Sequence, residues 1–274
     1  MAIAQAQLRG APFDAIAERY DETFTASKIG QAQRGSVWRE LEKAFRPGDR
    51  VLEIGSGTGV DACFLAEQGV RVVACDSSPR MIAVATRRIV EGENFRLVSL
   101  RLLAADEIAS LQSEGQFDGA FSNFGALNCI EDVQRFARDL AILLKPGATA
   151  LLCWMGPCCL WEIAWCLAHA KTAKAFRRFH RGGVTARLAE GATVRVHYPP
   201  IRLLDRAFGP EFRLVSIKGI GVSVPPSYLE PWAHRFPRLF ELSTQADLLL
   251  SHFPGVRALA DHILLEFRRE DLRV

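Results

Sequence analysis

Three glycines at alternate positions, Gly55, Gly57 and Gly59, follow directly after a short apolar segment at residues 50–54. Glycine adopts the positive φ angles that a tight turn needs, and its missing Cβ lets a ligand come close to the backbone. Residues 60–68 then have the pattern of a helix, and the first N–H groups of a helix have no partner inside it. A buried strand, a glycine turn and a helix in this order predict an α/β sheet with a ligand at the turn.

The pattern of strand and helix continues after this turn. We expect further strands at 70–75, 95–103, 117–121 and 148–154, and helices at 79–90 and 131–143. Strands that alternate with helices of this length predict a parallel sheet with right-handed crossovers. The strands are almost continuously apolar, which is typical of a sheet that helices cover on both faces.

The outer parts of the chain are less regular. Residues 1–45 have the pattern of polar helices, and after the core we expect a helix at 160–179, a hairpin at 184–198, a helix at 200–208, a strand at 212–224, a mainly helical stretch at 226–251 and a closing strand at 263–268. We predict a single domain over residues 1–274, in which 1–45 covers the ligand, 46–156 is the binding core, 157–198 and 226–255 are lid insertions, and 199–225 and 256–274 complete the sheet.

Composition limits the class of protein and its partners. The 274 residues are 49% hydrophobic and carry a net charge of +3, which is normal for a globular protein with a sizeable core. So mild a charge gives no reason to expect a nucleic-acid or membrane partner. We see no signal peptide and no apolar run long enough to span a bilayer. We therefore expect a cytoplasmic protein with reduced cysteines.

The spacing of the glycines discriminates between cofactors. A dinucleotide fingerprint, G-x-G-x-x-G, needs its third glycine at position 60, where this chain has Val60. The lysine of a phosphate-binding loop is also missing. Glu53 lies two residues before the first glycine, and a carboxylate there suits a cationic amino group better than a pyrophosphate. These features disfavour an NAD-dependent oxidoreductase.

The stretch Glu53-Ile54-Gly55-Ser56-Gly57-Thr58-Gly59 resembles motif I of the class I S-adenosylmethionine-dependent methyltransferases, and the order of elements over residues 10–155 is similar too. The resemblance is to the small-molecule group of type 11/25-like methyltransferases. It implies a Rossmann-like, doubly wound, mostly parallel sheet of seven strands with helices on both faces and helical or hairpin lid insertions. It also implies S-adenosyl-L-methionine as cofactor, with S-adenosyl-L-homocysteine as product, and contacts of motif I with the methionine part.

The resemblance assigns further cofactor contacts. Asp76, at the end of the second strand, is placed to accept hydrogen bonds from both ribose hydroxyls, or alternatively to cap the helix that Pro79 opens. Ser77 and Met81 follow where the family lines the adenine. Asp106 is our choice for the adenine amino group, although the frame can shift by one or two residues and a solvated helix start is the alternative.

Two more segments are placed near the methyl donor. Asn123, Phe124 and Gly125 follow the fourth strand, where the family faces the sulfonium and the substrate, and they differ from the N/D-P-P-Y/F motif of enzymes that methylate adenine or glutamine. Tyr20 lies in a segment that resembles the helix closing over the cofactor, and we expect it at the carboxylate end. A plain packing role is the alternative for Tyr20.

The acceptor side has no motif, because a sulfonium is already an activated donor and the enzyme mainly aligns the reactants and excludes water. His197, Tyr198 and Tyr228 are our candidates on the substrate side. Of these we choose His197 and Tyr228 as catalytic groups, since a base helps where the acceptor is a hydroxyl or thiol. We expect a small, partly apolar acceptor, O-methylation before C-, N- or S-methylation, no metal site, and a monomer or homodimer. A non-catalytic cofactor-binding protein and a methyltransferase acting on RNA or protein are the alternatives.

Overall fold

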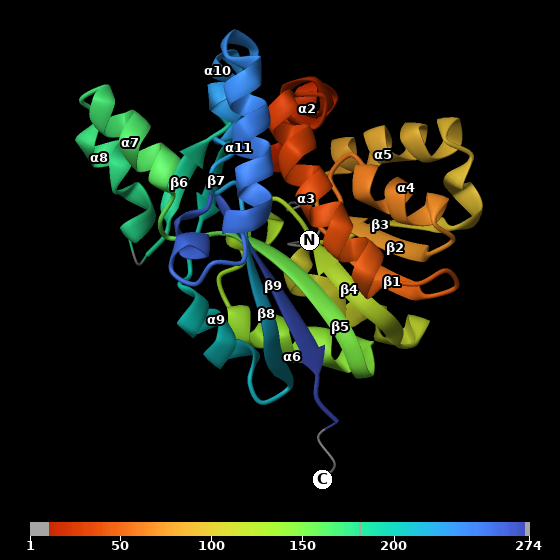
Figure 1. Ribbon diagram of the computed structural model, residues 1–274. Helices are drawn as coiled ribbons and strands as arrows, with labels where there is room; N and C mark the ends of the chain where they lie inside the picture. Colours follow the sequence, from red (N-terminus) through yellow and green to blue (C-terminus); the bar gives the residue numbers. More distant parts are fainter. Residues whose placement is uncertain (1–10, 181, 272–274) are drawn as a thin grey trace.

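A seven-stranded sheet forms the centre of the protein, whose computed structural model describes residues 11–180 and 182–271 (Figure 1). The strands of this sheet are β1 (Arg50–Ile54), β2 (Arg71–Asp76), β3 (Val98–Leu102), β4 (Phe117–Ser122), β5 (Leu144–Met155), β8 (Phe212–Ile220) and β9 (His262–Arg269). Their order is β3-β2-β1-β4-β5-β9-β8, with β1 to β5 parallel and β9 antiparallel to both of its neighbours. The predicted doubly wound, mostly parallel sheet is confirmed.

Helices cover both faces of the sheet, as the apolar strands predict. The covering helices are α3 (Lys28–Ala44), α4 (Val60–Glu67), α5 (Pro79–Glu91), α6 (Val133–Leu143) and α9 (Ile201–Phe208). Helices α6 and α9 pack on one face and α3, α4 and α5 on the other. Strand β5 supplies both cores, because its side chains alternate: Leu152 and Trp154 join the first core, and Leu151 and Cys153 the second.

Short helices at the N-terminal end lie against the glycine turn. They are η1 (Pro12–Ile16), α2 (Ala17–Tyr20) and η2 (Asp21–Thr25). Thr58 Oγ1 donates to Asp21 Oδ1 at 2.8 Å, and Ser78 Oγ donates to Asp14 Oδ1 at 2.5 Å. These bonds hold the N-terminal segment over the carboxyl ends of β1 and β2; residues 1–10 of the predicted covering segment lie outside the described residues.

The first insertion contains the predicted hairpin but not one long helix. It is made of α7 (Leu160–Ala168), α8 (Thr172–Ala175), η6 (Arg177–Phe179), β6 (Val184–Arg187), η7 (Ala189–Gly191) and β7 (Thr193–Val196). The helix expected at 160–179 breaks after α7, because Ala170 has a φ of 56° and a left-handed residue ends a helix. The hairpin tip, η7, contacts η1, so the insertion and the N-terminal segment meet.

The second insertion packs on helix α3. It holds η8 (Ser227–Leu229), α10 (Glu230–Arg235), α11 (Pro237–Leu250) and η9 (Val256–Leu259). The Glu230 carboxylate accepts from the backbone N–H groups of Lys28 at 2.8 Å and Ile29 at 3.1 Å. A carboxylate is favourable there because the first N–H groups of a helix lack partners. The remaining short helices are η3 (Asn94–Arg96), η4 (Ala105–Glu114) and η5 (Ala126–Cys129).

Candidate functional site

The glycine turn places backbone N–H groups at the carboxyl edge of the sheet. Gly55, Gly57 and Gly59 have φ values of 71°, 53° and 75°. A Cβ on Gly55 would lie 2.2 Å from the Cβ of Ala126, so this glycine is required by packing. A Cβ on Gly57 would meet nothing within 4 Å and would instead project into open space. Gly57 is therefore the position where the missing side chain leaves room for a ligand.

Asp76 ties the end of β2 to this turn. Its Oδ2 accepts from Gly57 N and its Oδ1 from Ser78 N, both at 2.8 Å. Helix α5 is capped by Ser78, whose Oγ accepts from Met81 N at 3.1 Å. The alternative of Asp76 as the helix cap is therefore wrong, and its carboxylate is held beside the glycine turn.

Glu53 is a buried carboxyl group that forms no ion pair within the described residues, although the nearby charge of Arg34 partly favours its ionised form. Its relative exposure is 2%, and its Oε2 has no hydrogen-bond partner within the described part of the chain. Burial, reinforced by the Asp61 carboxylate, raises the pKa of Glu53 well above its usual range. An unpaired buried carboxyl is costly unless it holds a proton or receives a cation.

A buried polar cluster lies beside the turn and was not predicted from the sequence. The Asp61 carboxylate accepts from Arg34 Nη1 at 2.5 Å, Trp38 Nε1 at 2.6 Å and Asn123 Nδ2 at 2.9 Å. Arg34 also stacks on the Phe124 ring, with its guanidinium carbon 4.9 Å from the ring centre. A small recess next to the turn is lined by Arg34 and Asp61 together with Ser56 and Thr58. The only sequence signal was an aspartate in the first turn of the helix after the glycines.

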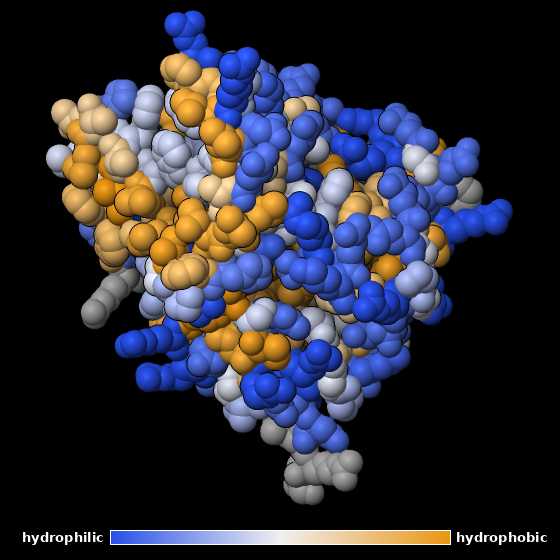
Figure 2. All heavy atoms as spheres, viewed as in Figure 1, coloured by the Kyte–Doolittle hydropathy of each residue, from blue (hydrophilic) through white to orange (hydrophobic). Residues whose placement is uncertain are grey.

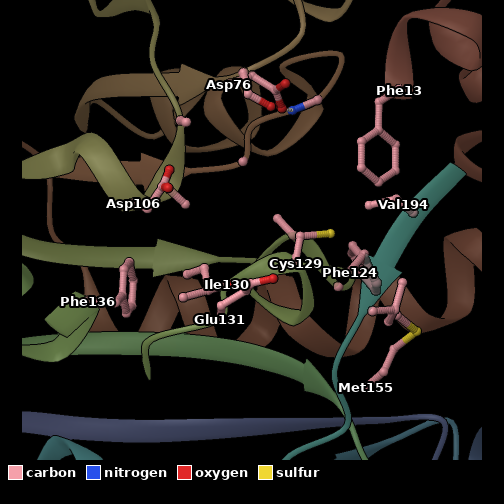
Figure 3. A pocket seen from close by; sticks show the side chains of 18 of the residues that line it. Phe13, Asp76, Asp106, Phe124, Cys129, Ile130, Glu131, Phe136, Met155 and Val194 are labelled. Carbon is pink, nitrogen blue, oxygen red and sulfur yellow. Dashed lines mark hydrogen bonds between the residues drawn. The ribbon is translucent and has the colours of Figure 1, made fainter. Parts of the chain in front are cut away.

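A cavity of about 780 Å³ joins these elements (Figure 3). Ten of the predicted cofactor residues line it, namely Tyr20, Gly55, Gly57, Asp76, Ser77, Met81, Asp106, Asn123, Phe124 and Gly125. In this view Asp106 lies on the left, Asp76 at the top near the middle, and Phe13, Phe124, Met155 and Val194 on the right. Glu53 and Gly59 are not among the lining residues: Glu53 is buried in β1, and a Cβ on Gly59 would lie 3.0 Å from that of Ala85.

The far end of the cavity is walled by one face of the hairpin. Ala186 of β6 and Val194 and Val196 of β7 line it, followed by Tyr198. Side chains on a strand alternate between its two faces. His197 therefore points the other way, and its ring packs beside Gly183, where an added Cβ would lie 2.9 Å from the imidazole.

The two predicted catalytic side chains are not brought to the cavity. His197 and Tyr228 are both absent from its described lining, and Tyr228 is 47% exposed near the start of α10. The lining includes Tyr198, which the sequence named beside His197 as a substrate-side candidate, and Arg177 from η6. The alternation of Val194, Val196 and Tyr198 with polar neighbours was the available signal. The second predicted lid, 226–255, contributes no described lining residue.

A buried ion cluster anchors the hairpin insertion to the sheet. Arg178 donates through Nε to Glu162 at 2.9 Å and through Nη2 to Asp261 at 2.8 Å, and Arg177 Nε donates to Glu162 at 2.5 Å. The Arg178 guanidinium carbon lies 5.3 Å from the centre of the Tyr198 ring. The hydrogen bond from Arg177 Nε to Glu162 thus holds Arg177 beside the cavity. The Arg178 guanidinium contacts the ring of Tyr198 and holds it in place.

The stretch that contains the glycine turn and the acidic end of β2 is similar to known proteins. Residues 52–150 match a family described as "Methyltransferase domain". This stretch is a class I S-adenosylmethionine-dependent methyltransferase domain. The matched residues run from within β1 to within β5. Both insertions, including the hairpin of the first, therefore lie outside the matched residues.

Curated proteins with a similar sequence are also named as methyltransferases. A demethylmenaquinone methyltransferase of Clavibacter sepedonicus is 32% identical over 146 residues, which cover 52% of this chain and 56% of that protein. The chain thus spans about half the length of the curated relatives it matches. The CcbJ methyltransferase of Streptomyces caelestis has a similar structure, with a TM-score of 0.61 and 18% identity over 96% of this chain and 99% of that one.

The same fold also occurs in a protein that is named as a cyclase and not as a methyltransferase. The [4+2]-cyclase SpnF has a TM-score of 0.59 and 16% identity over 94% of this chain and 93% of that one. At such identities the likeness concerns the fold alone. Chemistry must therefore be argued from the site.

Proposed function

We propose that this chain transfers a methyl group from S-adenosylmethionine to a small, partly apolar acceptor. The observation that carries the proposal is one cavity running from the glycine turn and Asp76 to the apolar face of the hairpin. Such a cavity has room for two ligands end to end, and the volume of about 780 Å³ lies in the range of ligand sites.

The residues at the turn fit the cofactor. The unpaired Glu53 carboxyl suits its amino group, and Tyr20 and Arg34 suit the carboxylate end, since Arg34 Nε has no partner within the described residues. The space over Gly57 leaves room for the chain of the methionine part. Asp76 is placed for the ribose hydroxyls. Ser77, Met81 and Asp106 are assigned to the adenine.

The acceptor end combines an apolar wall with two polar groups. When bound, the cofactor supplies an activated methyl group, so the protein's part is to align the acceptor and exclude water. We assign this alignment to the Tyr198 hydroxyl and the guanidinium nitrogens of Arg177 that are not bound to Glu162. Burial raises the pKa of Tyr198 despite the nearby Arg177, so its hydroxyl stays a donor at neutral pH.

Two donors facing an apolar wall favour an acceptor that carries an oxygen atom. The methylated atom does not follow from this: O-methylation stays our first expectation, and C-, N- and S-methylation are the alternatives. The relatives named for demethylmenaquinone act on a partly apolar small molecule by their name, which agrees with an apolar wall. Asn123, Phe124 and Gly125 line the cavity after β4 and are assigned to the donor sulfur.

A second candidate is a protein that binds the cofactor without transferring its methyl group. The reason for this second candidate is the structural likeness to a protein that is named as a cyclase. Turnover of any acceptor, detected as S-adenosylhomocysteine, excludes this candidate.

The test is calorimetric titration with S-adenosylmethionine, S-adenosylhomocysteine and NAD, followed by a screen of phenols, hydroquinones, amines and thiols. We expect micromolar binding of the two sulfur compounds and none of NAD. Binding of NAD alone, or of none of the three, would overturn the assignment of the cofactor.

A further inference from the structure

The exposed apolar side chains of this protein are concentrated on the two insertions. Twelve of the seventeen large apolar side chains that are exposed within the described residues lie in 160–179 and 228–253. Figure 2 shows them gathered over α7 and α8 and beside these on α10 and α11. Exposed apolar area of this extent marks a surface that another body covers.

The first part of this surface is the helical arm 160–180, which projects from the body in Figure 1. Trp165, Phe176 and Phe179 are 40%, 48% and 54% exposed. The exposed charged side chains of this arm are Lys171 and Lys174, because its one carboxylate, Glu162, is buried under two arginines.

The second part lies on α11 and the turn after it. Leu249 and Phe253 are 79% and 63% exposed. The exposed acidic side chain of residues 228–253 is Glu241, against the exposed bases Arg235 and Arg238. The two parts together, called here the insertion surface, are apolar with a surplus of basic groups.

We propose that the insertion surface docks this protein on an anionic lipid bilayer. Aromatic and leucine side chains enter the boundary between headgroups and acyl chains, and lysine and arginine are attracted to anionic headgroups. A second copy of the chain fits less well, because a two-fold contact through the same surface places its basic groups near one another. No helix in the described ranges is long and apolar enough to cross a membrane, and docking at the boundary needs none.

The position of the arm gives the docking a consequence. Phe176 and Phe179 flank Arg177, whose side chain lines the cavity. Docking therefore brings the acceptor end of the cavity to the bilayer, which suits an acceptor dissolved in lipid. This consequence rests on the proposed function, whereas the docking itself does not. Net charge alone led us to expect no membrane partner, and docking on a bilayer would make that expectation wrong.

The experiment is cosedimentation of the whole protein with vesicles of phosphatidylcholine, alone or with one third phosphatidylglycerol. We expect binding to the anionic vesicles that weakens with salt. F176S/F179S and L249S/F253S should each weaken binding by at least about tenfold. K171E/K174E should weaken it by at least about thirtyfold, because two attractions to the headgroups are lost and two repulsions are added. The matched control V90S/L203S changes two equally exposed apolar side chains outside the insertion surface and keeps binding.

Each variant is first checked for its melting temperature and for S-adenosylhomocysteine binding. Failure of the protein to bind that ligand contradicts the proposed function and leaves the docking result standing. Absence of binding to anionic vesicles at low salt overturns the docking, as does equal loss in the control. Light scattering that shows a dimer, dissociated by F176S/F179S, in a protein that ignores vesicles assigns the surface to a second copy instead.

Discussion

The carboxyl of Glu53 gives the most direct test of how this site binds its ligand. Because it is buried and unpaired, it holds a proton at pH values where an ordinary glutamate has lost its own. A bound ammonium group needs the carboxylate form. Cofactor binding should therefore release a proton from Glu53, and affinity should rise with pH until the raised pKa of the free protein is passed.

The substitution that tests this is Glu53→Gln, which keeps the shape and removes the charge. A hydrogen bond between charged groups contributes about 1.5–3 kcal/mol, so the dissociation constant of S-adenosylhomocysteine should rise by about 10- to 150-fold at pH 8. The loss should shrink as the pH falls, because the wild-type carboxyl is then protonated too.

As the pH rises, the stability of the ligand-free protein should fall while its affinity for the cofactor rises. Between the usual glutamate range and the raised pKa of Glu53, the folded state binds a proton that the unfolded state has released. Stability of the ligand-free protein therefore falls as pH rises through this window, by about 1.4 kcal/mol for each unit by which the pKa is raised. Glu53→Gln removes this cost and should be the more stable protein at pH 8.

The assay is calorimetry at pH 6, 7 and 8 in two buffers of different ionisation enthalpy, with thermal unfolding alongside. Glu67→Gln, on the exposed side of helix α4, is the matched control. Equal affinity of wild type and Glu53→Gln at pH 8, with no proton released, would refute this account of Glu53.

Further substitutions test other parts of the site. Gly57→Val should abolish S-adenosylhomocysteine binding in calorimetry, whereas Gly147→Val, which also has a positive φ and open space but lies outside the cavity, should keep it. Equal binding by both variants would mean that the ligand does not lie at the glycine turn. Asp76→Ala should weaken binding by about 1–3 kcal/mol, and unchanged affinity leaves Asp76 a purely structural role. Tyr198→Phe should lower turnover of the acceptor without changing cofactor affinity, which kinetics and calorimetry separate. Arg178→Met should destabilise the fold by about 3–5 kcal/mol in denaturant unfolding, because it removes the arginine from the buried Asp261 carboxylate and leaves Glu162 with Arg177 alone; a loss below 1 kcal/mol contradicts this.

Much of the fold was predictable because its signals are local. The glycine spacing, the apolar strands and the proline at the start of α5 each act within a few residues, and β1 was predicted with its observed bounds. Strands that alternate with helices leave few arrangements other than a parallel sheet. Of the assigned cofactor residues, those that lie at strand ends are brought together by the sheet itself, since its carboxyl ends meet at one edge.

The acceptor side was not predictable in the same way. The alternation of Val194, Val196 and Tyr198 was visible in the sequence, but which face of a hairpin turns inward depends on the body it covers. Choosing His197 over Tyr198 was a difference of one residue, and one residue along a strand reverses the face.

Sequence by itself therefore determined the elements, the class of sheet and the residues at its binding edge. Tertiary structure alone decided which polar groups are buried together. Arg34 and Asp61 are 27 residues apart and no local pattern pairs them, and none indicates that Glu230 joins the second insertion to helix α3. The reason is physical: burial and pairing of charges depend on contacts between distant segments, and no local pattern of residues encodes which segments will meet.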